Sequence, residues 1–189
     1  ARVTLREGAL PPVRLDDVTG DLGLLADARE EIVGAQTRAR NRLHAHLVVL
    51  LPGYGRTASQ LVTKRQLAAI EQALAPFDGV RARLARDLLT EVRALGARAD
   101  DLERQIASLV AGHPLLALPG VGPLTAARIV AEAGDVARFR SPDAFAMLAG
   151  VAPIPASSGQ VQRMRLNRGG NRRLNRALYT VALAQSWSH

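Results

Sequence analysis

The sequence predicts a mostly all-α fold: a long antiparallel helical coiled-coil hairpin followed by a small helical domain. Three observations predict it. Apolar residues recur at steps of three and four over two stretches of about thirty residues, the spacing of one helix face. Prolines and glycines fall between these stretches, where helices end. The last third contains a glycine hairpin, a short irregular or β-like loop and a basic helix.

The composition narrows the class of protein. The 189 residues are 48% hydrophobic, enough for a core, and contain no cysteine, which excludes a disulfide framework and cysteine zinc sites. No apolar run approaches the roughly 20 residues of a membrane span, and no signal-peptide pattern opens the sequence. We therefore expect a cytoplasmic protein. Both ends look cut, since no Met opens the sequence, so we expect a piece of a longer protein.

Residues 1–20 are predicted to be a linker from a missing upstream domain, because Pro11 and Pro12 favour extended backbone. Residues 21–113 are predicted to be a helical coiled-coil or oligomerisation region. Asp16 or Asp17 is the expected N-cap of its first long helix, which ends before Pro52. The expected buried stripe is Leu22, Leu25, Ala28, Ile32, Ala35, Ala39, Leu43, Leu47 and Leu50.

Two more helices complete this region. Thr57 and Gln60 match a capping box, and a short amphipathic helix is expected after them, up to Pro76. Its expected face is Leu61, Lys64, Leu67, Ile70 and Leu74. The third helix follows Asp78. Its expected stripe is Val80, Leu84, Leu88, Val92, Leu95, Ala99, Leu102, Ile106 and Leu109. Two long rods joined through a short helix predict an antiparallel pair. We favour dimerisation or higher homo-oligomerisation through the rods, with a bundle that closes on itself as the alternative.

Residues 114–189 are predicted to be a separate domain, and residues 114–134 resemble a helix-hairpin-helix motif. Gly120 and Gly122 lie in the tight hairpin, and Pro123 suits the first position of the helix that follows. In such motifs the hairpin amides and the helix N-terminus hold a DNA phosphate without reading sequence. Motifs of this shape also occur in a packing role only, and that alternative stays open.

A short helix is expected after Ser141, with Phe145, Met147 and Leu148 in the core. Residues 151–170 form the predicted serine loop, in which alternating apolar residues indicate a short strand or an irregular ribbon. A Gly-Gly turn leads into the predicted basic helix, residues 171–188. Its expected stripe is Leu174, Leu178, Val181, Ala182 and Gln185.

Residues 149–185 carry six arginines and no Asp or Glu. Guanidinium groups present forked donors that fit phosphate oxygens, so this segment predicts binding to a nucleic-acid backbone. The candidate ligands are Arg163, Arg165, Arg168, Arg172, Arg173 and Arg176. The alternative is a solvated helix face, although so many like charges repel one another unless a polyanion or carboxylates of another chain answer them.

No metal site is predicted within the sequence. The carboxylates at 16, 17, 100, 101 and 103 have the spacing of helix caps and solvated faces. His44 and His46 are two apart on a helix and therefore face different ways.

Three blocks together resemble the C-terminal transposase domain of the IS-one-ten (IS116/IS902-type) family. They are LPGVGPLTAARIVAEAGD, RFRSPDAFAMLAGVAPIPASSG and RGGNRRLNRALYTVALA. These are DEDD insertion-sequence transposases that act as bridge-RNA-guided DNA recombinases. LREGALPPVRL and RARNRLHAHL resemble the family's segment between its Ruv-C-like nuclease domain and that C-terminal domain.

The resemblance implies a function and a nucleophile. A serine of the C-terminal domain attacks DNA and becomes covalently linked to it, while four carboxylates of the Ruv-C-like domain hold Mg²⁺. The matching serine is Ser158, with Ser157 as the fallback because the Ser-Ser doublet leaves the register open by one. The expected partners are DNA, a guide (bridge) RNA and a second copy. The last metal-binding aspartate is expected upstream of Ala1, so this piece alone should bind nucleic acid without cutting it.

Two other functions fit the same residues. One is a non-catalytic helix-hairpin-helix adaptor that binds DNA at junctions or during repair. The other is an oligomerising helical scaffold whose basic end binds RNA or an acidic protein. A covalent serine–DNA adduct separates the recombinase from both.

Overall fold

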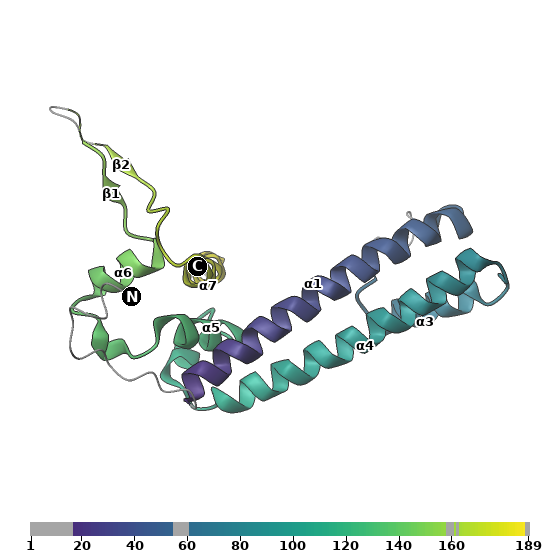
Figure 1. The fold of residues 1–189 in the computed structure, drawn as a ribbon, viewed down its shortest axis with the longest axis horizontal. Coiled ribbons are helices and arrows are strands. Elements are labelled where there is room, and N and C mark those ends of the chain that lie inside the picture. The colour runs from purple at the N-terminus through teal and green to yellow at the C-terminus, as the bar shows by residue number, and fades with distance from the viewer. Residues whose placement is uncertain (1–16, 55–60, 158–160, 162, 188–189) are drawn as a thin grey trace, which may run out of the picture. The chain divides into compact units, whose positions relative to one another are not determined.

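The computed structural model describes residues 17–54, 61–157, 161 and 163–187, and this part of the chain is mostly helical, as predicted (Figure 1). Contacts divide the chain into two compact units. The helical unit comprises Leu25–Gln105, and the second unit comprises the other described residues. No helix in the described ranges combines the length and the apolar character that a membrane span needs.

Two long helices run antiparallel in the helical unit. They are α1 (Val18–Leu50) and α4 (Val80–Leu109), with the shorter α3 (Lys64–Leu74) beside them. Arg42 pairs with Glu91 at 3.3 Å, and Arg29 pairs with Glu103 at 2.7 Å. The pair nearer the start of α1 is therefore the pair nearer the end of α4, which confirms the predicted antiparallel orientation. The carboxylate of Asp17 accepts the Thr19 amide and caps α1, as expected, whereas Asp16 lies outside the described residues.

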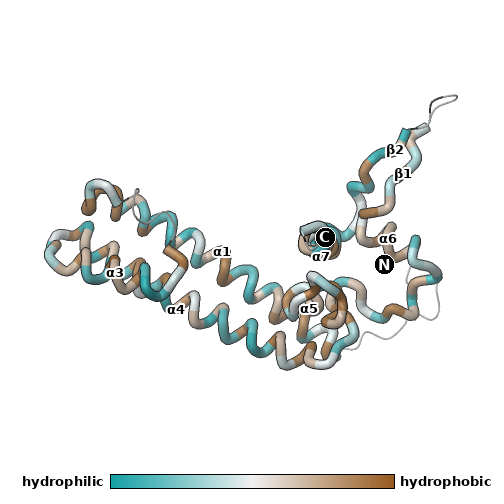
Figure 2. The backbone as a smooth tube through the Cα atoms, turned by 180° about the vertical axis from the view of Figure 1, so that it is seen from behind, coloured by the Kyte–Doolittle hydropathy of each residue, from teal (hydrophilic) through white to brown (hydrophobic). Residues whose placement is uncertain are grey.

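The core of the helical unit is shared by three helices rather than two. It joins the C-terminal half of α1, the whole of α3 and the N-terminal half of α4. The buried side chains are Ala39, Leu43, Leu47, Tyr54, Leu61, Leu67, Ile70, Leu74, Ala85, Leu88, Leu89 and Val92. Hydrophobic and hydrophilic positions alternate along these helices, as amphipathic helices require (Figure 2).

The predicted stripe of α4 is wrong at both ends. Val80, Leu84 and Leu109 are exposed, by 66%, 43% and 41%. Ala82 and Leu89 are buried in the N-terminal half, beside the correctly predicted Leu88 and Val92. A strict heptad drifts around a helix of 3.6 residues per turn, and this half of α4 packs against both α1 and α3. Its buried face is therefore wider than a single seam.

The start of α3 differs from the expectation as well. The Thr57–Gln60 pair lies outside the described residues, and the capping box that the structure contains is Thr63–Gln66. The Gln66 amide donates to Thr63 Oγ1 at 3.2 Å, and the Thr63 amide donates to Gln66 Oε1 at 2.9 Å. Leu61 therefore precedes the helix, although its side chain is buried. The Thr-x-x-Gln spacing occurs twice, and a pattern alone does not choose between the two.

A buried glutamine joins the long helices. Gln36 Nε2 donates a 3.0 Å hydrogen bond to the Val92 carbonyl oxygen. A Cβ atom at Gly96 would lie 2.7 Å from that nitrogen, so glycine leaves the room that Gln36 occupies. The polar group is thus buried with a partner.

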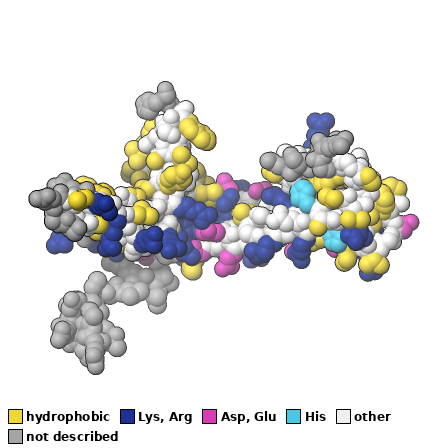
Figure 3. Space-filling view, turned by 90° about the horizontal axis from the view of Figure 1, so that it is seen from above, with side chains coloured by type: hydrophobic (Ala, Val, Ile, Leu, Met, Phe, Trp, Pro, Cys, Tyr) yellow, Lys and Arg dark blue, Asp and Glu magenta, His cyan; other side chains and the backbone are white. Residues whose placement is uncertain are grey.

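Basic and acidic side chains are interspersed along the outside of the long helices (Figure 3). Arg93 lies 2.7 Å from Glu71, and its hydrogen bond and charge lower the pKa of that carboxyl. Arg104 pairs with Asp101 within α4. Asp101 and Glu103 therefore serve in surface pairs, in line with their predicted place on a solvated face.

The second unit is built from short elements. They are η1 (Pro114–Ala117), α5 (Pro123–Ala133), η2 (Val136–Arg138), α6 (Pro142–Ala149), the strands β1 (Ile154–Pro155) and β2 (Met164–Arg165), and α7 (Arg172–Ser186). Its core joins α5, α6 and α7 through Ile129, Ala149, Leu174 and Ala177, with Phe145 and Leu148 packed against them. Two expectations were wrong: Met147 is 45% exposed, and Ala177 replaces Ala182 on the buried face of α7.

Candidate nucleic-acid interface

Asn171 fixes the start of the basic helix. Its Oδ1 accepts the amides of Arg173 and Leu174, both at 3.0 Å, and so caps α7. Its Nδ2 donates to Glu132 Oε2 at 2.7 Å, and its backbone amide donates to the Leu148 carbonyl at 2.6 Å. One residue therefore ties α7 to α5 and α6. An asparagine between Gly-Gly and a helical apolar stripe is an N-cap signal that the sequence carried.

Two glycines hold the strands against α6. A Cβ atom at Gly170 would lie 2.3 Å from the Gly150 Cα, so the two backbones touch where only glycine fits. Gly150 also has φ of 71°, a left-handed conformation that ends α6. Asn167 Nδ2 donates to the Met147 carbonyl at 2.9 Å, and Asn175 Nδ2 donates to the Ala149 carbonyl at 3.1 Å. The base of the strands is thus anchored by backbone contact and by two amides.

The predicted ribbon is a two-stranded antiparallel pair. Ile154 faces Arg165 and Pro155 faces Met164, and the Ala156 amide donates to the Arg163 carbonyl at 2.7 Å. Ser157 follows on the first strand, exposed, with its Oγ accepting the Arg163 amide at 3.3 Å. Ser158, the preferred nucleophile from the sequence, lies outside the described residues.

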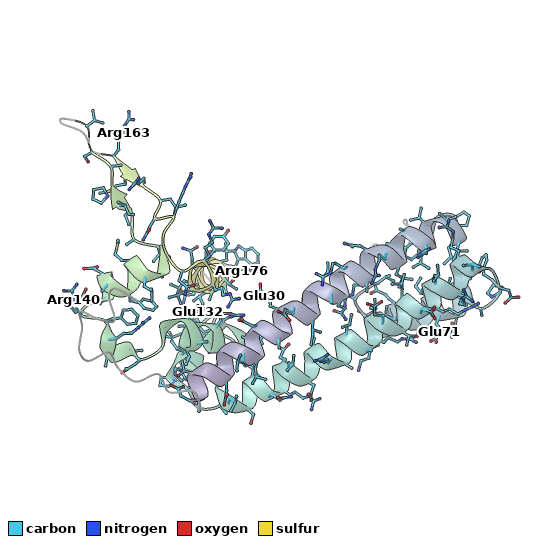
Figure 4. The ribbon with its side chains drawn as sticks, viewed as in Figure 1. Glu30, Glu71, Glu132, Arg140, Arg163 and Arg176 are labelled. Carbon is cyan, nitrogen blue, oxygen red and sulfur yellow. The ribbon has the colours of Figure 1, made fainter. Side chains whose placement is uncertain are left out.

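The six arginines occupy three places. Arg163 and Arg165 are exposed on the ribbon, and Arg163 lies toward its far end (Figure 4). Arg168 and Arg172 line one open cavity of about 370 Å³ at the junction of ribbon and helix. Arg173 and Arg176 lie on the first turns of α7, both exposed.

A carboxylate of the same chain reaches this cluster. Glu132, near the end of α5, lies 3.7 Å from Arg173 and 3.4 Å from Arg128, and Figure 4 shows it beside α7. Glu132 was not expected at this site because it lies outside the acid-free segment of residues 149–185. The expectation that only a polyanion or another chain would answer these charges is therefore wrong for Arg173. Among the described residues, no carboxylate pairs with four of the other arginines, all of them exposed: Arg163, Arg165, Arg168 and Arg172.

The glycine hairpin lies against α7. Gly120 has φ of 79°, and a Cβ atom there would lie 2.8 Å from the Ala184 Cβ. Gln185 Nε2 donates to the Pro119 carbonyl at 3.0 Å. Gly122 is the N-cap of α5, with open space where its Cβ would be. The element before the hairpin is the single 3₁₀ turn η1, so the helix-hairpin-helix motif stays a prediction, as does its contact with DNA.

The described residues do not provide a metal site. Within the described ranges, no three His, Asp or Glu side chains come together as ligands for an ion.

Comparison with known proteins identifies the second unit. Residues 112–189 match a family model described as Transposase IS116/IS110/IS902 family. This part of the chain belongs to that transposase family. The matched range contains all six arginines, both candidate serines, the glycine hairpin and the Asn171 cap.

Individual proteins that are similar to this chain extend the similarity beyond residues 112–189. A probable family 20 transposase of Pseudomonas aeruginosa is 35% identical over 67% of this chain and 40% of its own length. The insertion element IS900 uncharacterized 42 kDa protein of Mycobacterium paratuberculosis is 28% identical over 92% of this chain and 56% of its own length. The insertion element IS110 uncharacterized 43.6 kDa protein of Streptomyces coelicolor is 27% identical over 89% of this chain and 54% of its own length. The chain thus spans about half the length of the relatives it matches.

Proposed function

We propose that this chain is the DNA-handling part of an insertion-sequence transposase, which moves a mobile element by DNA strand cleavage and exchange. The observation that carries the proposal is the exposed ribbon of the family-matched domain. It bears Arg163 and Arg165 beside Ser157, the first serine of the Ser-Ser doublet in the sequence. A hydroxyl and two cations thus occupy one exposed segment within reach of a polyanion.

The chemistry we assign to the doublet is phosphoryl transfer to serine, with Ser158 as the nucleophile and Ser157 as the alternative. The serine oxygen forms a bond to phosphorus as its proton leaves, and the bond from phosphorus to a deoxyribose oxygen breaks. That oxygen takes up a proton and departs as a hydroxyl, leaving DNA joined to the protein. Attack by a second strand's hydroxyl reverses the step and rejoins DNA. Positive charge around the phosphate stabilises the transition state of both steps.

The arginines would hold the strand in that reaction. Arg168 and Arg172 line one cavity, and their guanidinium groups suit the two free oxygens of a phosphodiester. Phosphate contacts of this kind position the backbone and carry little sequence information. Target choice would therefore come from a guide RNA, which we propose as a partner of the complete protein together with a second copy and Mg²⁺ in a carboxylate domain.

The test is the covalent intermediate. Suicide DNA substrates, in which the leaving strand diffuses away, should trap a protein–DNA adduct with the complete transposase, and mass spectrometry of the digested adduct should place it on Ser158. Ser158→Ala should abolish adduct and transposition together, while Ser157→Ala retains both. Adduct formation by the Ser158→Ala, Ser157→Ala double variant would refute serine catalysis. A protein that binds the substrate and never forms an adduct would instead be the non-catalytic adaptor.

A further inference from the structure

The helical unit contains a cavity remote in sequence from the serine and the arginine cluster. Its volume is about 670 Å³, and it lies between α1, α4 and the first residues of α3. Ligand pockets that hold a nucleotide-sized molecule commonly have volumes of this order. All of its lining residues belong to the helical unit, so the cavity does not depend on the second unit.

One face of α1 forms a wall of this cavity. Arg29, Val33, Gln36 and Arg40 follow one another at steps of four, three and four, which places them in one row along the helix. Gln36 is held in that row by its hydrogen bond to the Val92 carbonyl, opposite Gly96. The wall therefore has an arginine at each end and two neutral side chains between them.

Two buried nitrogens in this wall have no acceptor. Arg29 Nε and Arg40 Nε are both buried, and neither has a hydrogen-bond partner among the described residues. Arg29 uses its Nη2 on Glu103 at 2.7 Å, but its Nε stays unsatisfied. Buried guanidinium donors without an acceptor are unusual in folded proteins. Each of these two guanidinium groups therefore keeps donor capacity that the described residues do not satisfy.

The charge balance of the lining points the same way. Four cations line the cavity against the single carboxylate of Asp100. Arg29 is paired with Glu103. Arg93 is paired with Glu71, which Figure 4 labels. Within the described ranges, Arg40 and Lys64 have neither an ion pair nor a hydrogen bond to a carboxylate. Two cations that line one cavity without a carboxylate partner among the described residues suit a phosphate group.

We propose that this cavity binds an organic phosphate: the phosphate lies between Arg40 and Lys64 and accepts from their guanidinium and ammonium groups, and the ligand's ring lies on the apolar wall. Val33, Val62 and Leu67 supply that wall. The ligand is either a free nucleotide or the terminal nucleotide of a nucleic-acid strand, because the two share this chemistry. The site is distinct from the arginine cluster that we assign to the DNA backbone.

Isothermal titration calorimetry of the 189-residue chain tests the proposal with three probes: ADP, inorganic phosphate and a short 5′-phosphorylated RNA. The measurements use an Arg163→Gln, Arg165→Gln, Arg168→Gln background, so that RNA binding through the second unit is weakened. We expect ADP or the phosphorylated RNA to bind more tightly than inorganic phosphate. Arg40→Gln and Lys64→Gln should each weaken that binding about tenfold, the effect of losing a charge-assisted hydrogen bond.

Matched controls lie on the same helices. Arg38→Gln and Arg65→Gln remove the same charge from exposed positions that do not line this cavity, and binding should change less than about twofold because exposed charges are screened. Urea unfolding of each variant checks that the fold persists. ADP bound without RNA assigns a free nucleotide, and RNA bound without ADP assigns a strand end. Binding of neither, equal losses in the controls, or inorganic phosphate bound as tightly as ADP and the RNA would each overturn the proposal.

Discussion

The side-chain amide of Asn171 lies 2.7 Å from the carboxylate of Glu132, thirty-nine residues earlier in the chain. The same asparagine caps α7 with its carbonyl oxygen, so one side chain satisfies helix donors and holds the neighbouring helix. The start of the basic helix, and with it Arg172 and Arg173, is therefore positioned by α5.

Replacing Asn171 should destabilise the chain. Asn171→Ala removes the cap and the bond to Glu132, and we expect a loss of about 1–2 kcal/mol in the free energy of unfolding, measured by urea denaturation. Asn41→Ala is the control, since Asn41 is exposed within α1, away from the helix ends, and should change stability by less than about 0.5 kcal/mol. Equal effects of the two variants would contradict the capping role.

Gly170→Ala should be more damaging than a glycine substitution beside it. The new Cβ would lie 2.3 Å from the Gly150 Cα, and because both are backbone the strands must separate from α6. We expect a loss of about 3 kcal/mol or more. Gly169→Ala meets only Asn167 Oδ1, at 3.6 Å, and should cost less than about 1 kcal/mol. Thermal melts followed by circular dichroism compare the stability of the two variants. Equal stability would show that Gly170 does not pack closely against Gly150.

The salt dependence of DNA binding should depend on Arg163, Arg165 and Arg168 of the second unit. The triple variant Arg163→Gln, Arg165→Gln, Arg168→Gln should weaken duplex binding for all sequences alike and lower the slope of log K against log salt by about one per lost phosphate contact. Trp187, the only tryptophan of the chain, is 84% exposed at the end of α7, so its fluorescence reports binding.

A charge-matched triple on α4 is the control for that experiment. Arg81→Gln, Arg83→Gln, Arg98→Gln removes three exposed arginines of the helical unit, and the salt slope should stay near that of the unmodified chain. A loss as large as that of the Arg163, Arg165, Arg168 triple would mean that net charge, and not the interface of the second unit, determines binding.

Tyr54 should make stability fall at alkaline pH. Burial raises the pKa of Tyr54 above its ordinary value of 10.0. Its stabilising contribution is therefore complete below pH 10.0 and is lost as the pH rises through the folded-state pKa, because the unfolded chain releases the proton first. Urea unfolding between about pH 9 and about pH 11 should show a smaller decline for Tyr54→Phe, which does not titrate. Parallel declines would show that Tyr54 ionises equally in both states.

The helices and their order were predictable because their signals are local. Periodicity gave both long helices, and the caps of Asp17, Ser141 and Gly150 depend on residues within one turn. The predictions that were wrong concern side chains whose burial depends on neighbours distant in sequence. Leu84 is exposed and Leu89 buried because α3 packs on that end of α4, which the pattern of α4 alone does not encode.

The candidate site divides in the same way. The arginine cluster and the ribbon follow from composition and alternation within residues 149–185. Glu132 joins the cluster only through the packing of α5 on α7, and Gly120 meets Ala184 from sixty-odd residues away. The need for glycine at position 120 was predictable from the hairpin, but its contact with α7 was not.

Lys64 is the only lysine of the chain, and it lies at the cavity between α1, α3 and α4. An amine-reactive reagent at mildly alkaline pH will therefore modify a single side chain, besides the terminal amine. A dye, spin label or crosslinker introduced in this way reports on one known place in the helical unit without any engineered cysteine. Protection of that amine by a bound compound would identify occupants of the cavity directly in a mixture.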